Sequence, residues 1–93
     1  MAELSWLPEA LQDIGRLHAF LAETSPDAAR RLAAALLQGA EQLRAHPQMG
    51  RPHGGAYREW LVRFSTAHYV LRYRVVGDDH VVVVRVWHER ERR

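Results

Sequence analysis

The 93-residue sequence contains no cysteine and no lysine, and none of its apolar runs approaches the length of a membrane span. The absence of cysteine excludes a disulfide framework and thiolate chemistry. A bilayer-spanning helix needs about 20 apolar residues, and no N-terminal signal peptide is visible, so we expect a cytoplasmic protein with no membrane partner. The length predicts a single domain over residues 1–93.

All 13 basic side chains are arginine, and they are unevenly distributed along the chain. Residues 1–57 carry five arginines against six acidic residues, whereas residues 58–93 carry eight against five. Arginine stays charged and offers planar, bidentate contacts to phosphate and carboxylate groups. The surplus in the second segment indicates an acidic or phosphate-bearing partner, and an ordinary solvated surface is the alternative.

Three segments rich in branched and aromatic residues predict strands late in the chain, at 57–64, 68–76 and 80–88. The joins between them, 65–67 and 77–79, are short enough for tight turns. This spacing predicts an antiparallel meander.

A first amphipathic helix is predicted over residues 8–23, because apolar residues recur there at helical spacing. The stripe consists of Ala10, Ile14, Leu17 and Leu21, widened by Leu11 and Phe20. The residues predicted to face away are Glu9, Gln12, Asp13, Arg16 and Glu23.

A second helix is predicted to begin at Pro26, with Ser25 as its N-cap, and to end at His46 and Pro47. The very short link between the helices predicts an antiparallel helical hairpin. A short edge strand at 3–7 precedes the hairpin, and a loop at 48–56 follows it.

The predicted fold is therefore α+β in the order β-α-α-β-β-β, with a helical hairpin packed on one face of a small, mostly antiparallel sheet. Side-chain alternation places two sets of residues on single faces of their strands. These are Tyr69, Leu71, Tyr73 and Val75 in the middle strand, and Val82, Val84 and Val86 in the last strand. The arginines are then expected to line the face that the helices leave open.

Several motifs spread over nearly the whole chain together resemble the ParE/RelE superfamily of toxins from bacterial type II toxin–antitoxin systems. They are Trp6-Leu7-Pro8-x-Ala10-x-x-Asp13-Ile14, Pro47-x-x-Gly50-Arg51, Tyr57-Arg58-Glu59, Tyr69-Val70-Leu71-x-Tyr73-x-Val75 and Val84-x-Val86-x-His88. RelE-like members cut messenger RNA on the ribosome, whereas ParE-like members share the fold and act on DNA gyrase.

The resemblance favours the ParE-like branch. In the RelE-like branch of this superfamily, the expected site is rich in lysine and arginine and has a tyrosine near the C-terminus. This sequence has no lysine and no tyrosine after Tyr73, and Val70 stands where RelE-like proteins carry an arginine. The resemblance thus implies a non-catalytic inhibitor of DNA gyrase that needs no cofactor and is neutralised by a cognate antitoxin.

The two branches imply different roles for the same residues. On the ParE-like interpretation, the surface that recognises gyrase or gyrase-bound DNA consists of Arg58, Arg72, Arg74, Arg85, Trp87, His88 and Arg90. On the RelE-like alternative, an endonuclease acting on the ribosome with its mRNA, the catalytic candidates are His88, Arg85 and Glu59. A third alternative is an inactive family member that only binds the antitoxin.

The resemblance also implies an antitoxin whose C-terminal segment folds onto the toxin. Candidate contacts on the outward side of the hairpin are Leu11, His18, Ala34 and Leu37. No two histidines lie four residues apart on one helix, so no metal site is predicted. The charged tail at 89–93 is expected to be mobile.

Overall fold

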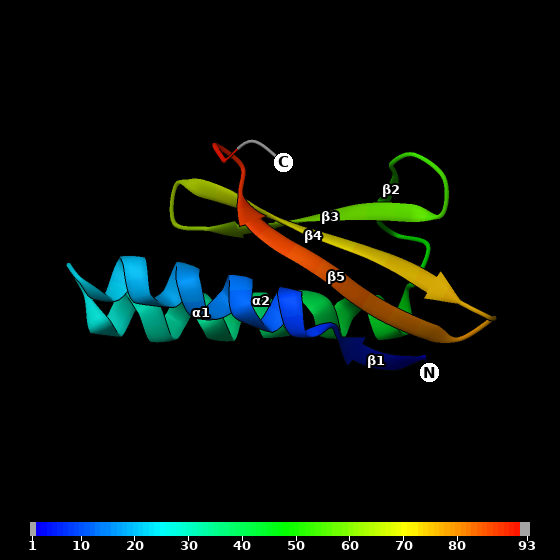
Figure 1. The fold of residues 1–93 in the computed structure, drawn as a ribbon, viewed down its shortest axis with the longest axis horizontal. Helices are drawn as coiled ribbons and strands as arrows, with labels where there is room; N and C mark the ends of the chain where they lie inside the picture. Colours follow the sequence, from blue (N-terminus) through cyan, green and yellow to red (C-terminus); the bar gives the residue numbers. More distant parts are fainter. Residues whose placement is uncertain (1, 92–93) are drawn as a thin grey trace.

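Two helices lie side by side against one face of a five-stranded sheet (Figure 1). The computed structural model describes residues 2–91. Its elements are β1 (Glu3–Trp6), α1 (Pro8–Ala22), α2 (Pro26–Ala45), β2 (Arg51–Pro52), β3 (Tyr57–Phe64), β4 (Ala67–Val76) and β5 (His80–His88). The predicted α+β fold, with a helical hairpin covering one face of the sheet, is confirmed.

Both helices begin at a proline, whose missing amide costs nothing in a first helical turn. Before α2, the side-chain oxygen of Ser25 accepts a hydrogen bond from the N–H of Ala28 at 3.1 Å. Only residues 23–25 separate the helices, so the predicted antiparallel hairpin forms. Within residues 2–91, neither helix has the length and apolarity that crossing a membrane requires.

The strands are ordered β1-β5-β4-β3-β2 across the sheet. β3, β4 and β5 form the predicted antiparallel meander, and β1 joins its edge by pairing in parallel with β5. The predicted loop at 48–56 is wrong in one respect, because it contains β2, in which Arg51 pairs with Glu59. A two-residue strand is too short to show any side-chain alternation in the sequence.

A bulge in β5 inverts the side-chain alternation that the sequence predicts. Tyr73 lies opposite Val83, whereas Leu71, two residues earlier, lies opposite Val86, three residues later. The fully buried valines of β5 are Val81, Val83 and Val86, while Val82 and Val84 are only half-buried. The prediction that Val82, Val84 and Val86 share one face is therefore wrong, because one extra residue shifts the period of two.

The core lies between the hairpin and the sheet, and α2 approaches the sheet closely at Gly39. A Cβ atom at this position would lie 2.5 Å from Cγ2 of Val62 in β3. The largest fully buried side chains are Tyr73, Leu32, Leu36, Leu43, Leu71, Val81, Val83 and Val86.

The apolar stripe of α1 is narrower than the sequence predicts. Leu11 and Phe20 were expected to widen it, but they are 53% and 76% exposed. Because α1 packs on α2 and along the single strand β5, a narrow stripe is enough to cover that contact.

Candidate functional site

A hydrogen-bonded junction fastens the segment after α2 to β4. The hydroxyl of the fully buried Tyr73 accepts a hydrogen bond from the N–H of Gly50 at 2.9 Å and donates one to the carbonyl oxygen of Pro47 at 2.7 Å. A Cβ atom on residue 50 would lie 2.5 Å from that hydroxyl oxygen, so the junction requires glycine. Burial raises the pKa of Tyr73, and the Gly50 N–H and the Arg58 charge offset part of the rise.

Arg58 belongs to the same junction. It lies opposite Tyr73 in the pairing of β3 with β4, so the two side chains share the helix side of the sheet. Its guanidinium donates hydrogen bonds to the carbonyl oxygens of Gly50, at 2.7 Å, and Gln48, at 3.2 Å. The expected position of Arg58 on the open face is therefore wrong, and here the side chain closes a loop.

Arg72 is the central arginine of the open face, and it is held in place by its neighbours. Its Nε and Nη2 atoms donate to Oε2 of Glu59 at 3.1 Å and 2.8 Å. Nη2 also lies 3.1 Å from Nε2 of His53, and the guanidinium lies 4.8 Å from the centre of the Trp87 ring. Arg72 is thus a paired and oriented cation, whereas Arg74, two residues later on this face, is exposed.

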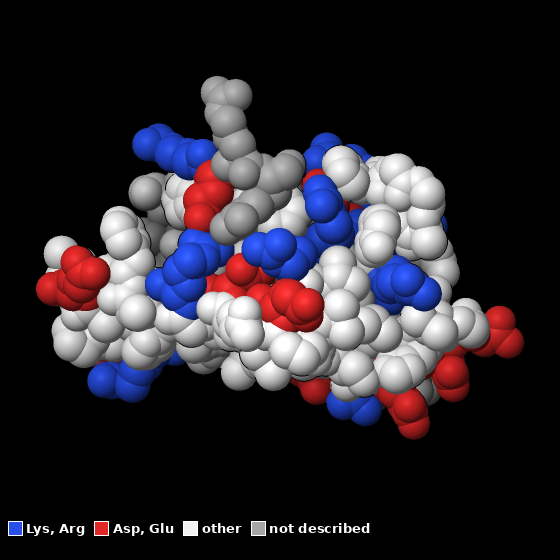
Figure 2. All heavy atoms as spheres, in the orientation of Figure 1, with Lys and Arg blue, Asp and Glu red and all other residues white. Residues whose placement is uncertain are grey.

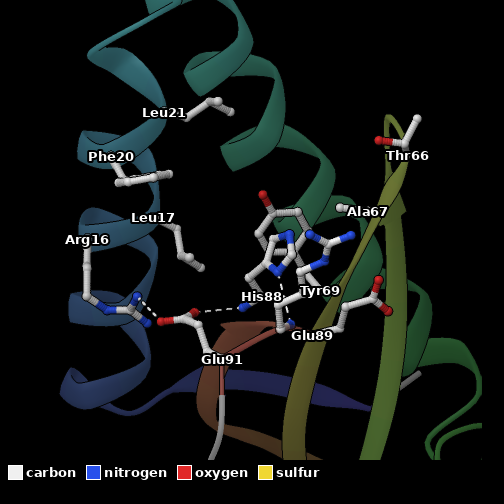
Figure 3. A pocket seen from close by; sticks show the side chains of 11 residues that line it. Arg16, Leu17, Phe20, Leu21, Thr66, Ala67, Tyr69, His88, Glu89 and Glu91 are labelled. Atoms are coloured by element: carbon white, nitrogen blue, oxygen red, sulfur yellow. Dashed lines mark hydrogen bonds and ion pairs between the residues drawn. The ribbon is translucent and has the colours of Figure 1, made fainter.

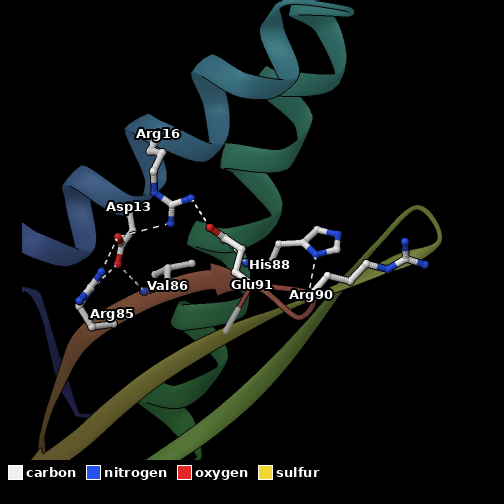
Figure 4. Close-up of polar contacts among 7 residues, drawn as sticks. All are labelled: Asp13, Arg16, Arg85, Val86, His88, Arg90 and Glu91. Atoms are coloured by element: carbon white, nitrogen blue, oxygen red, sulfur yellow. Dashed lines mark hydrogen bonds and ion pairs between the residues drawn. The ribbon is translucent and has the colours of Figure 1, made fainter. Parts of the chain in front are cut away.

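Arg85 is bound to α1 through Asp13 (Figure 4). Its Nε and Nη2 atoms donate to the two carboxylate oxygens of Asp13 at 2.8 Å and 3.1 Å. Asp13 also accepts the backbone N–H of Val86 at 2.9 Å and is only 4% exposed. The prediction that Asp13 faces away from the core is wrong.

The sequence held a signal for this buried carboxylate. Asp13 lies between the buried residues Ala10 and Leu17, at spacings of three and four that place all three on one side of the helix. An acid within an apolar stripe is stable only with hydrogen-bonding partners. Here β5 provides them just beyond its bulge.

The charge state of Asp13 follows from its partners. Burial alone would raise the pKa of Asp13, but hydrogen bonds from Arg85 and Val86 and the positive charges of Arg85 and Arg16 outweigh that effect. The pKa of Asp13 therefore lies below its ordinary value, and the carboxylate is ionised at neutral pH. In return, Asp13 raises the pKa of Arg85.

A cleft of about 840 Å³ opens between α1, the turn joining β3 to β4, and the end of β5 (Figure 3). Leu17, Phe20 and Leu21 form its wall on α1, and Tyr69 lies on the opposite side. The remaining lining residues are Arg16, Thr66, Ala67, His88, Glu89, Arg90 and Glu91. An apolar wall with polar groups gathered at one side is typical of a binding site.

His88 lies in this cleft with its ring fixed. The ring meets Tyr69 edge-on, with centroids 5.1 Å apart and planes at 82°. Nδ1 accepts a hydrogen bond from the backbone N–H of Arg90 at 3.0 Å. The proton of the neutral ring therefore lies on Nε2, and the lone pair on Nδ1 is already occupied.

The three catalytic candidates of the nuclease alternative do not come together. His88 shares the helix side of the sheet with Tyr69, Glu59 lies on the open face beside Arg72, and Arg85 is paired with Asp13. The cleft nevertheless brings His88 close to two other arginines and two glutamates, Arg16, Arg90, Glu89 and Glu91. This composition is of the kind that acid–base cleavage of RNA uses.

The chemistry available to these groups is limited by how they are engaged. Arg16 pairs with Glu91 at 2.6 Å, and the two arginines of the cleft are matched in number by its two glutamates. Burial raises the pKa of Tyr69, and the Glu91 charge raises it further, so its hydroxyl stays protonated. With Nδ1 of His88 occupied, the neutral ring offers Nε2–H as a donor and no free lone pair as an acceptor.

The residues expected to contact an antitoxin lie on the helical hairpin, at the positions that the sequence predicted. Leu11, Ala34 and Leu37 are exposed, and His18 is half-buried. Their role in binding stays a prediction.

Arginine side chains gather over the middle of the face formed by β5 and α1, with acidic side chains between them (Figure 2). The ion pairs of the molecule include Arg16–Glu91, Arg85–Asp13 and Arg72–Glu59. In the described part of the chain, residues 2–91, no three histidine or acidic side chains cluster in a way that suits a metal ion.

Comparison with known proteins gives consistent results at the level of sequence and of fold. Residues 4–93 match the family described as "ParE toxin of type II toxin-antitoxin system, parDE". Two proteins of Caulobacter vibrioides are similar in sequence: Toxin RelE3, with 41% identity over 92% of each chain, and Toxin RelE1, with 39% identity over 90% of this chain and 89% of the other.

One solved structure shares the fold. It is described as "Chromosomal ParDE TA system from P. aeruginosa", and the two chains superpose with a TM-score of 0.78 over 95% of this chain and 96% of the other. Their sequences are 18% identical, so this likeness concerns the fold.

Proposed function

The chain belongs to the ParE family of toxins from type II toxin–antitoxin systems, and from this premise we propose that it inhibits DNA gyrase without catalysing a reaction itself. Family membership makes it the toxin component of such a system and implies an antitoxin partner. The gyrase target and the absence of catalysis are the proposed part.

The observation that carries the proposal is the state of His88. A ribonuclease of this type needs a group that removes the proton of the 2′-hydroxyl. Nδ1 of His88 already accepts the Arg90 N–H at 3.0 Å, which leaves the neutral ring with a proton on Nε2. The neighbouring cation Arg16 is paired with Glu91, so it is not available to a phosphate unless that pair opens.

We assign the gyrase contact to those predicted target-binding residues whose side chains are accessible at the surface. Arg74 and Arg90 are exposed and lie on strand β4 and just after strand β5. Arg72 and Trp87 stack on each other on the open face, and His88 lies with Arg90 in the cleft. Arg58 and Arg85 are committed to internal partners and serve the fold.

A supercoiling assay with purified gyrase tests the proposal. We expect the wild-type protein, in excess over gyrase, to block supercoiling and to accumulate cleaved DNA complexes. The variants R74Q and R90Q should weaken inhibition, because they remove exposed cations while keeping similar side-chain length. R30Q is the matched control, since Arg30 is an exposed arginine of α2 paired with Asp27. Undisturbed supercoiling by the folded wild-type protein would refute the gyrase target.

The second candidate function is a ribosome-dependent mRNA endonuclease. It is favoured by the sequence similarity to the proteins named Toxin RelE3 and Toxin RelE1, and by the histidine, acids and arginines that line the cleft. Cleavage of mRNA in a translation extract, abolished in H88A, would establish it in place of gyrase inhibition. A protein that is harmless when produced without its antitoxin would be an inactive family member.

The antitoxin contact is proposed for the outer side of the hairpin. Leu11 and Leu37 are 53% and 47% exposed, so both offer apolar surface to a partner that packs on the hairpin. We expect L11A and L37A to weaken antitoxin binding about tenfold or more each while changing stability little. Unchanged affinity, measured by calorimetry with the cognate antitoxin, would move the contact elsewhere.

A further inference from the structure

The segment that follows β5 is connected to the core by a continuous series of polar contacts (Figure 4). Oε1 of Glu91 accepts the N–H of His88 at 2.8 Å, and Oε2 of Glu91 pairs with Nη1 of Arg16 at 2.6 Å. Nη2 of Arg16 lies 3.5 Å from Oδ1 of Asp13, the buried carboxylate of α1. The series therefore runs from the core, through α1, to the end of the described chain.

The fixed point of this series is Asp13. Three groups besides Arg16 hold its carboxylate: Nε and Nη2 of Arg85 and the N–H of Val86. A carboxylate with this many donors and 4% exposure has no freedom to rotate. Because one side of the Arg16 guanidinium faces this fixed charge, the other side is aimed at Glu91.

The segment at 88–91 is itself a compact turn. The N–H of Glu91 donates to the carbonyl oxygen of His88 at 2.8 Å, and the N–H of Arg90 donates to Nδ1 of His88. The N–H of Glu89 donates to the carbonyl oxygen of His68 in β4 at 3.0 Å, which secures the start of the turn. Arg16 secures its end from the opposite wall of the cleft.

We propose that Asp13 and Arg16 are positioning residues, which hold the turn at 88–91 against α1 so that His88 and Arg90 are presented to the target in one fixed arrangement. This inference rests on the proposed function only for the identity of the target. The geometry requires no contact between Asp13 and the target, and Arg16 acts through Glu91.

A positioning role predicts an effect on recognition that is larger than the effect on folding. The side chains of Arg16 and Glu91 are 40% and 31% exposed, so their pair contributes little to the stability of the fold. Releasing the turn adds an ordering cost to every binding event. We therefore expect R16Q and E91Q each to weaken gyrase inhibition about three- to tenfold, and the double variant to be no worse than either single one.

Amide hydrogen exchange provides a readout that does not depend on gyrase. The N–H groups of His88 and Glu91 are bonded within the turn, so both should exchange faster in R16Q and in E91Q than in the wild type. The charge-exchanged double variant R16E/E91R should not recover slow exchange, because an arginine at position 91 cannot accept the His88 N–H and a glutamate at position 16 would face the Asp13 carboxylate. R30Q is the control, because the Arg30–Asp27 pair has the same 2.6 Å separation but lies on α2.

The outcomes separate the two proposals. If the wild type leaves gyrase unaffected while R16Q speeds exchange at His88 and Glu91, the target is wrong and the positioning of the turn stands. If exchange in R16Q equals that in the wild type, the positioning role is refuted whatever happens to gyrase. Faster exchange with fully retained gyrase inhibition would also refute it, since the arrangement of the turn would then not matter for recognition.

Discussion

Tyr69 and Tyr73 lie on the same face of β4, four residues apart, and their surroundings differ completely. The Tyr73 hydroxyl is bonded on both sides, to Gly50 and Pro47, in a space that a single methyl group would overfill. Tyr69 instead lines the cleft and touches the edge of the His88 ring. One end of the strand is packed for stability, and the other end leaves room for a partner.

The two phenols also show how environment separates two identical groups. Burial raises the pKa of both. For Tyr73 the bound N–H and the Arg58 charge oppose the rise, whereas for Tyr69 the Glu91 charge adds to it. A positive charge and a donated hydrogen bond thus mark the end of β4 that is packed into the core, whereas a negative charge marks the end that lines the cleft.

Among tests of the difference between the two ends of β4, the variant G50A should destabilise the protein most. The new Cβ would lie 2.5 Å from the Tyr73 hydroxyl oxygen, so the junction would open and lose hydrogen bonds, at a cost of about 3 kcal/mol. Urea unfolding measures the loss. G15A is the matched control, because nothing lies within 4 Å of its Cβ and alanine favours a helix by about 1 kcal/mol, so that variant should be stabilised.

D13N should lower the free energy of unfolding by about 2 kcal/mol at neutral pH, because a buried carboxylate loses the charge that Arg85 and the Val86 N–H bind. The pKa of Asp13 is lowered on folding, so its stabilising effect is complete above the unfolded value of about 4 and disappears as the pH falls through the folded value.

Thermal unfolding from pH 7 to pH 2 checks this. The difference in unfolding temperature between the wild type and D13N should be largest at pH 7 and should disappear in the acid range below pH 4. A gap that is constant with pH would show that the carboxylate charge is not what stabilises the fold.

Y73F removes only the hydroxyl of the junction. The Gly50 N–H would lose its acceptor in a buried site, and we expect a loss of about 1–2 kcal/mol. Y69F is the comparison, and it should change the free energy of unfolding by less. Equal losses for the two variants would contradict the distinction between the two ends of β4.

F20A should have the smallest effect on folding. Phe20 is 76% exposed on the wall of the cleft, so its truncation should change stability by no more than about 0.5 kcal/mol. A partner that fills the cleft would nevertheless bind less tightly. A clear loss of stability in F20A, measured by urea unfolding, would mean that this wall belongs to the core.

The sequence predicted the elements and the fold class because each rests on a local pattern. Apolar spacing of three and four residues defined both helices, and Ser25 with Pro26 marked the start of α2 to the residue. Branched and aromatic runs bounded β3 and β5 at the residues observed. The edge position of β1 followed from its length.

The candidate site was less predictable, because it depends on register and on contacts between distant residues. The extra residue in β5 leaves no mark in the run Val81 to Val84, where each residue suits a strand equally well. Arg58 bonds to backbone carbonyls, and carbonyl positions cannot be inferred from residue type. Asp13 was the one signal present and missed, an acid inside an apolar stripe.

The contact between Asp13 and Val86 also bears on whether the edge of the sheet can pair with other molecules. β1 ends at Trp6, and the amide of Leu7 makes a last bond to Val83, so the outer edge of β5 loses its strand partner halfway along. Bare strand edges recruit strands from other molecules and seed aggregates. The Asp13 carboxylate of α1 accepts the Val86 N–H just past the bulge, so this amide is not free to pair with a strand of another molecule. The same contact therefore favours solubility as well as folding.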